Sequence, residues 1–333
     1  MVSRTLSQIP IWIALLCTLG VIIASPHAQG SEPLDSGAPT GPMKVSITVD
    51  DLPEHDGRVF GVTREEIAHA IIKALKDNDI EHVYGFANGY FMRYQPEEVS
   101  ILKDWLLGGH SLGNHTFGHL DLNHFDADFY IADIVAEQSL LQKLEASVGR
   151  QDRLLFRYPY LDEGDDLSKR NRVRDYLAKN GYQVAQVTAD YEDWAWNRAY
   201  SRCVSQNNTE EIEWLKAHVA ESSDTTLRNS KAIAELLFGR DVPHILLIHM
   251  SYFNAVILGS LLKHWRAKWV EFVQLDETLK DPIYRTNPNL AYSDGLTFLE
   301  QIARARGVDI RRFQGTTVPF DFLNKMCNPR VHN

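Results

Sequence analysis

The feature of this sequence that most constrains its fold is a repeated pattern in which short apolar runs end in polar residues. Five polar clusters each follow such a run directly. They occupy residues 50–51, 115–119, 157–160, 190–194 and 249. In a fold that alternates strands with helices, the C-terminal ends of the strands open onto one common mouth. We therefore expect these clusters, which are distant in sequence, to lie close together.

Stretches with strand character alternate with amphipathic helical stretches along most of the chain. Strands are expected at residues 44–49, 82–87, 111–114, 154–157, 183–188, 244–248 and 270–274. Helices are expected after Thr63 and after Pro96, and at residues 127–148, 167–180, 255–267 and 296–305. Thr63 and Glu66 have the spacing of a capping box, and Gly307 is a plausible C-cap for the final helix.

This alternation predicts a parallel sheet that is either closed or open and doubly wound. The even spread of polar clusters over five strand ends favours closure. We therefore predict a distorted (β/α) barrel with about seven parallel strands and a catalytic site at their C-terminal ends.

Composition narrows the class of partner. The 333 residues are 44% hydrophobic and 23% charged, which is ordinary for a globular protein. The net charge is -10 and no lysine or arginine cluster occurs. This excludes nucleic acid and an anionic membrane surface as natural partners and favours a neutral or cationic substrate. The oligomeric state is not readable from the sequence.

The N-terminus reads as a secretory signal peptide over residues 1–28. Arg4 precedes an apolar stretch at residues 9–24, and small residues follow at Ala24, Ser25 and Ala28. An uncleaved anchor is the alternative, although the run is short for a bilayer. We expect cleavage, no membrane span afterwards, and a secreted or periplasmic protein. Residues 29–42 are a polar linker rich in glycine and proline.

Two cysteines, Cys203 and Cys327, remain after this cleavage. Outside the cytoplasm they can form one disulfide, but two unpaired thiols fit the sequence equally well. Cys17 does not lie at a cleavage point, so a lipoprotein anchor is not expected.

The candidate metal ligands are two histidines and a carboxylate. His115 and His119 are four residues apart, which on a helical turn would place both rings on one side. This spacing alone is weak evidence, but Asp51 can supply a third ligand from another strand end. Two imidazoles and one carboxylate suit zinc, or another divalent transition metal, with a position left open for water.

The remaining polar residues each have a simpler interpretation. For Asp50 and Asp51 alone, a turn or cap role is the preferred reading. Arg157 can hold a carboxylate ionised, or it can form only a structural salt bridge. A histidine at a buried strand end, such as His249, is usually a hydrogen-bonded core residue. Four aromatic residues near the expected mouth, which can stack on sugars or simply pack, are Tyr90, Phe91, Trp196 and Tyr252.

Together these clusters resemble the five ordered motifs of the polysaccharide deacetylases of the NodB-homology type, carbohydrate esterase family 4. Residues 48–51 (TVDD) match the first motif, with Val49 where phenylalanine is common. The others are HTFGH at 115–119, RYPY at 157–160, DYEDW at 190–194 and LLIH at 246–249. Each motif is weak alone, but five in order are a strong signal. On this basis we place a deacetylase domain at residues 43–283 and a C-terminal extension, packed on or near the barrel, at 284–333.

The resemblance implies a role for each matching residue. Asp51, His115 and His119 would bind the metal, and Asp50 would be the general base, paired with Arg157. The backbone N–H of Tyr160 would help to hold the oxyanion. Asp193 would orient His249, the general acid. Trp194 and Leu247 would form an apolar pocket for the acetyl methyl group.

The implied activity is metal-dependent removal of acetyl groups from an acetylated polysaccharide, with cell-envelope peptidoglycan as the first guess. The alternatives are a chitin-oligosaccharide deacetylase, an O-deacetylase, or a secreted carbohydrate-binding protein that has lost its activity. Two histidines and a carboxylate also occur in non-haem iron oxygenases. That reading leaves Asp50, Arg157 and His249 without a role.

Overall fold

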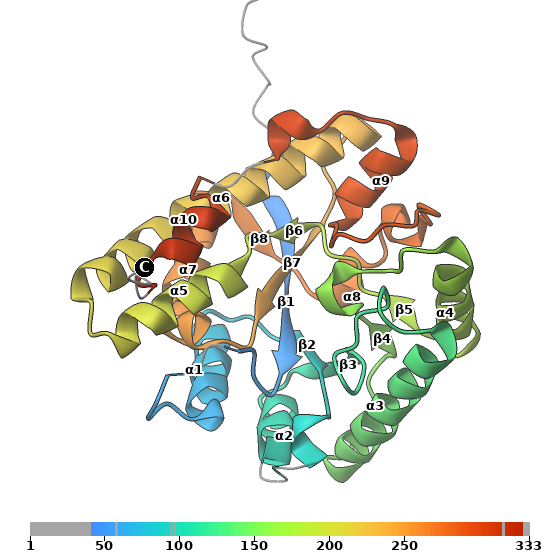
Figure 1. The fold of residues 1–333 in the computed structure, drawn as a ribbon, viewed down its shortest axis with the longest axis horizontal. Coiled ribbons are helices and arrows are strands. Elements are labelled where there is room, and N and C mark those ends of the chain that lie inside the picture. Colours follow the sequence, from blue (N-terminus) through green and yellow to red (C-terminus); the bar gives the residue numbers. More distant parts are fainter. Residues whose placement is uncertain (1–40, 57–58, 94, 96–97, 315–316, 329–333) are drawn as a thin grey trace, which may run out of the picture. The chain divides into compact units, whose positions relative to one another are not determined.

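A parallel β-sheet forms the centre of the protein in the computed structural model, which describes residues 41–56, 59–93, 95, 98–314 and 317–328. Its strands are β1 (Met43–Leu52), β2 (Tyr84–Ala87), β3 (Ser111–Asn114), β4 (Leu155–Phe156), β5 (Gln183–Val184), β6 (Ala189–Asp190), β7 (His244–His249) and β8 (Val270–Phe272). Their order is β5-β4-β3-β2-β1-β7-β6, and β8 pairs with the first residues of β1 (Figure 1). All described pairings are parallel, as the sequence predicted.

The sheet curls so that its two edges approach each other. β5 lies at one edge and β6 at the other, yet only residues 185–188 separate them in sequence. Five residue steps span at most about 18 Å of extended chain, so the edges cannot be far apart. The predicted distorted barrel is therefore confirmed. The predicted strand at residues 183–188 is wrong in detail, because only residues 183–184 form a strand there (β5). The next strand, β6, begins at Ala189 at the opposite edge, and the described strands number eight.

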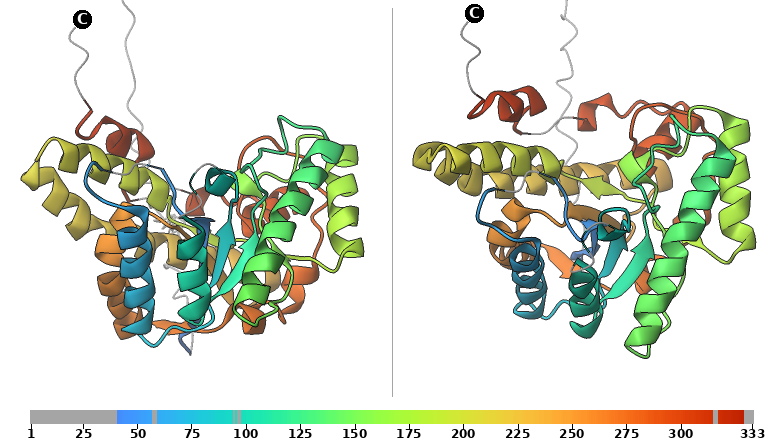
Figure 2. Two further views of the ribbon diagram at one scale, coloured as in Figure 1. Left: turned by 90° about the horizontal axis from the view of Figure 1, so that it is seen from below. Right: turned by 60° about the horizontal axis from the view of Figure 1, so that its bottom comes forward.

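Helices cover the outside of this sheet. They are α1 (Arg64–Lys76), α2 (Val99–Leu107), α3 (Ala127–Ser147), α4 (Leu167–Lys179), α5 (Asp193–Ser205), α6 (Thr209–Phe238), α7 (Tyr252–Lys268), α8 (Leu275–Thr278), α9 (Phe298–Arg306) and α10 (Phe320–Lys325). Figure 2 shows α1, α2 and α3 side by side on the outer face. The Thr63–Glu66 capping box is present at the start of α1, whose buried stripe includes Ile67, Ile71 and Leu75.

The central strand β1 is covered on both faces. Every residue from Met43 to Leu52 except Lys44 is buried. This explains its nearly continuous β-branched and apolar sequence, because strands buried on both faces lose the alternation of polar and apolar side chains. The strand ends on Asp50, Asp51 and Leu52, so its buried frame delivers two carboxylates to the mouth.

The C-terminal region contributes two helices rather than one. α9 has a capping box at Thr297 and a left-handed C-cap at Gly307, as predicted. The expectation that it is the last helix is wrong, because α10 follows. The sequence left α10 unrecognised because its six residues are too few to show a helical period.

A disulfide between Cys203 and Cys327 joins the end of α5 to the residues that follow α10, with the two Cα atoms 5.1 Å apart. This resolves the alternative that the sequence left open. Arg202 also donates hydrogen bonds to the backbone oxygens of Leu323 and Met326. The end of the described chain is therefore fixed to α5.

Within the described part of the chain, no helix has the length and apolar character needed to cross a membrane. The predicted signal peptide falls outside the described residues, as does nearly all of the predicted linker. Both remain predictions.

Candidate active site

Asp50 and Asp51 end β1 and both face one cavity. Adjacent side chains on a regular strand point to opposite faces. Asp51 escapes this rule because its φ is 63°, in the left-handed region that aspartate tolerates better than most residues. The backbone turns at this residue, and both carboxylates line a cavity of about 400 Å³.

His115 and His119 follow β3 in a loop, not on the helical turn that their spacing suggested. Thr116 and His119 both have positive φ values, 61° and 51°, which a helix does not contain. Side chains hold this loop. The Asn114 amide oxygen accepts from the N–H of Thr116, and Asp133 accepts from the N–H of Gly118. The two imidazole rings are nevertheless brought to a centroid separation of 5.0 Å.

The three predicted metal ligands converge on one point. Oδ1 of Asp51 lies 3.1 Å from Nε2 of His119 and 3.5 Å from Nε2 of His115. One ligand atom from each residue lies within 4.8 Å of the other two. Oδ1 of Asp51 is buried and accepts no hydrogen bond from the described residues. A buried carboxylate oxygen without a donor is costly, and a cation would remove that cost.

His115 is oriented as a metal ligand. Its Nδ1 donates to the backbone oxygen of Arg157 at 2.8 Å, which leaves a lone pair on Nε2 toward Asp51. Burial on its own would raise the pKa of Asp51, but the neighbouring histidines, His119 foremost, hold it well below its usual value. An ionised carboxylate and a neutral imidazole are the forms that bind a metal. The residues present therefore fit a divalent ion such as zinc.

Arg157 fixes Asp50 from behind the cavity. One guanidinium nitrogen donates to both Asp50 oxygens at 3.1 Å, and another donates to Thr48. Its Nε donates to the backbone oxygen of Ala185, and its guanidinium lies 4.5 Å from the ring of Phe86. Arg157 is 1% exposed, so it acts on the cavity through Asp50 rather than by contact with a ligand.

Asp193 holds His249 from the other side of the mouth. Its Oδ1 accepts from Nδ1 of His249 at 2.6 Å, and its Oδ2 accepts from the His249 backbone N–H at 2.7 Å. The Asn254 amide donates to the same carboxylate. Burial would lower the pKa of His249, but Asp193 raises it to about 10. The imidazolium form is thereby favoured, with Nε2 left for the cavity.

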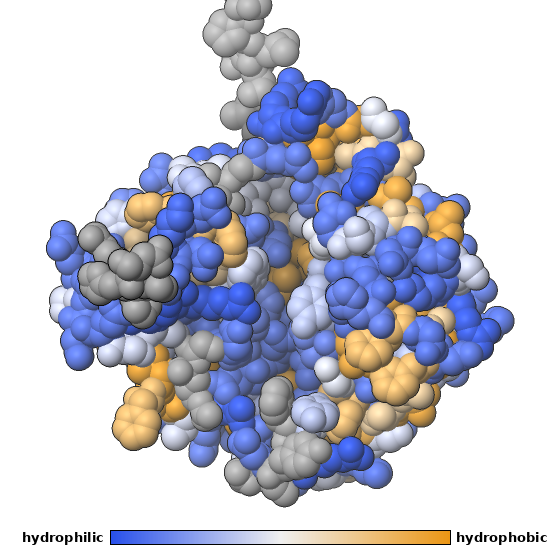
Figure 3. Space-filling view, in the orientation of Figure 1, coloured by the Kyte–Doolittle hydropathy of each residue, from blue (hydrophilic) through white to orange (hydrophobic). Residues whose placement is uncertain are grey.

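Tyr160, Trp194 and Leu247 complete the cavity wall. Tyr160 has a φ of 58° within a short 3₁₀ turn, and its ring packs edge-on against His119. Only glycine fits at position 295 beside this turn, because a Cβ there would lie 2.3 Å from the backbone oxygen of Tyr160. Seen from the side of Figure 1, this face is hollowed near its centre and mainly hydrophilic (Figure 3).

The aromatic residues expected near the mouth divide into different environments. Trp196 is 1% exposed and stacks between Trp214 and Phe253, so it belongs to the core. Tyr252 packs against Tyr200. Tyr90 lines a second cavity of about 390 Å³ that continues from the first. The side chain of Phe91 lies outside the described part of the structure.

His55 is a member of the site that sequence reasoning missed. Its Nδ1 lies 2.5 Å from Oδ2 of Asp51, and its ring lies 4.4 Å from that of His249. Its Nε2 faces Asp56 at 3.1 Å. The group Asp51, His55 and His249 also has metal-ligand spacing. However, His55 already faces a carboxylate with each nitrogen, so it fits a supporting role to Asp51 better. Its only sequence signal was its position four residues after Asp51.

Comparisons with known proteins agree with the resemblance seen in the sequence. A family model described as polysaccharide deacetylase matches residues 37–185, which contain the first three motifs. A search of curated proteins gives no match.

Among solved structures, a family 4 carbohydrate esterase from Bacillus subtilis is 18% identical, over 72% of this chain and 82% of that one, with a TM-score of 0.44. A polysaccharide deacetylase from Bacillus cereus is 19% identical, over 70% and 91%, with a TM-score of 0.46. A pseudoenzyme of the same esterase family from Bacillus anthracis is 17% identical, over 73% and 66%, with a TM-score of 0.44.

Proposed function

We propose, from the premise that residues 37–185 of this chain match the polysaccharide deacetylase family, that the protein is a metal-dependent hydrolase of N-acetyl groups on a cell-envelope polysaccharide. Peptidoglycan is the first substrate to test. The observation that carries this proposal is the buried, donor-free Oδ1 of Asp51 between His115 and His119, in the same cavity as Asp50 and His249.

Asp51, His115 and His119 would hold the ion, which would supply Lewis-acid activation of water and of the acetyl carbonyl. Asp50, fixed in place by hydrogen bonds from Arg157, would take the proton of the attacking water. The N–H of Tyr160 would donate to the oxygen of the tetrahedral intermediate. The imidazolium of His249 would protonate the nitrogen as the C–N bond breaks, because an unprotonated amine leaves poorly. Acetate and a free amine on the sugar would be the products.

Three connected cavities support a polymer as the substrate. The catalytic cavity shares Asp51, His55, His119, Tyr160 and Arg198 with the cavity beside Tyr90. On its other side it shares Leu161, Asp190, Glu192 and Gly295 with a cavity against α6. An extended groove of this kind accommodates several sugar units, with the scissile acetyl group at its centre. The disulfide supports an oxidising compartment, as expected for a secreted or periplasmic protein.

The test is acetate release from acetylated glycans (peptidoglycan, N-acetylglucosamine oligomers and an O-acetylated glycan), with and without a chelator. We expect release from an N-acetylated polymer, loss of release with the chelator, and recovery on adding zinc. No release from any glycan by the zinc-loaded protein would reject a deacetylase and leave a carbohydrate-binding protein. Acetate release that persists in the presence of the chelator would show that the activity does not require a metal.

A further inference from the structure

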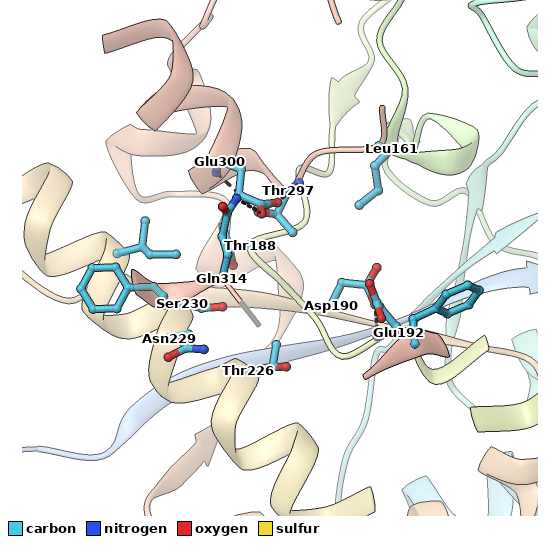
Figure 4. Close-up of a pocket in the computed structure, with 14 residues that line it drawn as sticks. Leu161, Thr188, Asp190, Glu192, Thr226, Asn229, Ser230, Thr297, Glu300 and Gln314 are labelled. Atoms are coloured by element: carbon cyan, nitrogen blue, oxygen red, sulfur yellow. Dashed lines mark hydrogen bonds between the residues drawn. The ribbon is translucent and has the colours of Figure 1, made fainter. Parts of the chain in front are cut away.

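Apart from Leu161, the residues that line the cavity against α6 lie outside the stretch that matches the family. It has a volume of about 380 Å³, and its walls come from α6, from the segment around α9 and from Phe313, Gln314 and Phe320. Figure 4 shows Asp190 and Glu192 on one side and Asn229 and Ser230 of α6 on the other. Because this cavity and the catalytic cavity share Asp190 and Glu192, a bound polymer can occupy both at once.

The described residues that line this cavity include three carboxylates, Asp190, Glu192 and Glu300, and no lysine, arginine or histidine. Two of the three already accept hydrogen bonds. Glu300 accepts from the N–H and hydroxyl of Thr297, and Asp190 accepts from the N–H of Glu192. Glu192 is different. It sits at the N-cap of α5 with a φ of 56°, but its side chain does not cap the helix.

Within the described residues, the Glu192 carboxylate has no ion pair or hydrogen bond to another side chain. Partial burial raises its pKa above the ordinary value, and the nearby Glu300 adds to that rise. A cation in the cavity would offset this repulsion and give the free carboxylate a partner.

Ser230 provides an independent sign that the cavity receives a polar ligand. The residue is only 6% exposed and lines the cavity opposite Glu192. Among the described residues, its hydroxyl has no hydrogen-bond partner. The hydroxyl is not among the fully enclosed atoms, so it is accessible from the cavity and can bond to a polar ligand there. Phe320 adds an apolar surface to the cavity. Its ring lies 5.2 Å from that of Trp194 in the catalytic wall.

We propose that this cavity is a subsite for a sugar unit that carries a free ammonium group, next to the acetylated unit being hydrolysed. This inference rests on the proposed function, whose product is such an amine. The Glu192 carboxylate would pair with the ammonium group, Ser230 and Asn229 would bond to hydroxyl groups, and Phe320 would contact the sugar ring. The enzyme would then prefer a polymer that is already partly deacetylated. The net charge of -10 favours the same cationic ligand.

The experiment measures binding by calorimetry near neutral pH with the full chain carrying Asp50→Asn, which prevents turnover. The probes are a trimer of glucosamine, a trimer of N-acetylglucosamine, and Nα-acetyl-lysine amide. We expect the glucosamine trimer to bind about tenfold tighter than the acetylated trimer, the scale of one charge-assisted hydrogen bond. Glu192→Gln should remove this preference, and Glu235→Gln, at an exposed position of α6, should keep it.

Two further variants locate the amine. Asn229 lines this cavity but not the catalytic one, so Asn229→Phe should fill the subsite and abolish the preference. Retention of the preference in Asn229→Phe or in Glu192→Gln would overturn the assignment, as would equal affinity for the two trimers. Binding of the lysine amide as tight as that of the glucosamine trimer would reject a sugar as the ligand. Unfolding midpoints, measured in parallel, identify a variant that fails to fold, and Thr226→Leu then replaces Asn229→Phe.

Because no catalysis occurs in this assay, its outcome is independent of acetate release. A protein that releases acetate but shows no preference for the glucosamine trimer would refute the subsite alone. A protein that shows the preference but releases no acetate would refute the proposed function.

Discussion

Two buried aspartates on opposite walls of the mouth, Asp51 and Asp193, are surrounded in opposite ways. Asp193 accepts three hydrogen bonds, two from His249 and one from Asn254. Asp51 accepts one from His55, and its other oxygen faces two imidazole nitrogens without a hydrogen bond from the described residues. A carboxylate whose oxygens are all bonded orients its partner. One with a buried, free oxygen is prepared for a cation.

The backbone conformation also differs between the wall that carries the metal ligands and the acid wall, made by Asp193 and His249. Asp51 and His119 both have positive φ, so the metal wall, made by Asp51, His115 and His119, depends on strained positions at the end of β1 and in the loop after β3. Asp193 opens a regular helix, and His249 ends a regular strand. On the metal wall, strained backbone positions bring three ligands together. On the acid wall, hydrogen bonds connect a regular helix to a regular strand. Substitutions should accordingly affect binding on one wall and proton transfer on the other.

The largest effect on turnover is expected from Asp50→Asn, which removes the base between the two walls. The metal should stay bound, because Asp50 is not among its ligands. Acetate release should fall by roughly two to four orders of magnitude, the usual scale for a general base. Asp175→Asn, at an exposed position on α4, is the matched control. Near-normal turnover in metal-loaded Asp50→Asn would show that Asp50 is not the general base.

His249→Ala tests the acid wall and should cost about two orders of magnitude on an amide. An activated acetyl ester should lose far less, because its leaving group needs no proton. Metal content should not change. The check is the ratio of amide to ester turnover in the variant and in the wild type. Equal losses on both substrates would leave His249 as a structural residue.

Asp193→Asn should act through pH. Asp193 raises the pKa of His249 to about 10, so removing its charge should bring that pKa back toward the ordinary value of about 6.5. The basic limb of kcat/KM should then move to lower pH, and turnover at pH 7.5 should fall about tenfold as the imidazolium fraction drops. A bound cation near Asp51 would lessen the shift. A basic limb that stays in place would contradict the pairing.

The same pair should affect stability with a defined sign. Because folding raises the pKa of His249, the pair contributes its full stabilisation below about pH 6.5 and loses it as pH rises toward 10. In Asp193→Asn this pH-dependent part should be absent from the unfolding free energy measured by denaturant between pH 6 and pH 10.

The smallest effect on turnover is expected from the double variant Cys203→Ser/Cys327→Ser. The disulfide joins residues 124 apart, so its loss should lower the free energy of unfolding by about 2–5 kcal/mol. Turnover should change little, because Asp193, at the other end of α5, is held by His249 and Asn254. A large loss of turnover in folded protein would show that α10 and its contact with Trp194 position the acid wall.

The sequence predicted the fold and the residues that line the mouth because both depend on local patterns. Apolar runs that end in polar clusters are visible in one dimension, and so are the capping boxes at Thr63 and Thr297. The loop at His115–His119 was mistaken for a helical turn because its side-chain contacts come from Asn114 and Asp133, which no spacing rule reveals.

Other features were missed for related reasons. His55 enters the site only because the chain turns at Asp51, and a lone histidine gives no signal of that turn. The division of residues 183–190 between β5 and β6 depends on the curl of the whole sheet. Gly295 and Phe320 reach the mouth from far along the chain, through contacts that form only in the folded protein. The chemical roles assigned to the site residues remain predictions until the variants are measured.

The most direct test of the contrast between Asp51 and Asp193 is a zinc titration of the purified protein in three forms: wild type, Asp51→Asn and Asp193→Asn. One zinc ion per chain is expected in the wild type and in Asp193→Asn. In Asp51→Asn the zinc affinity should fall by about 100-fold or more, since a direct ligand should matter at least as much as an outer partner. Undiminished zinc binding by Asp51→Asn, or an equal loss in both variants, would contradict the metal site.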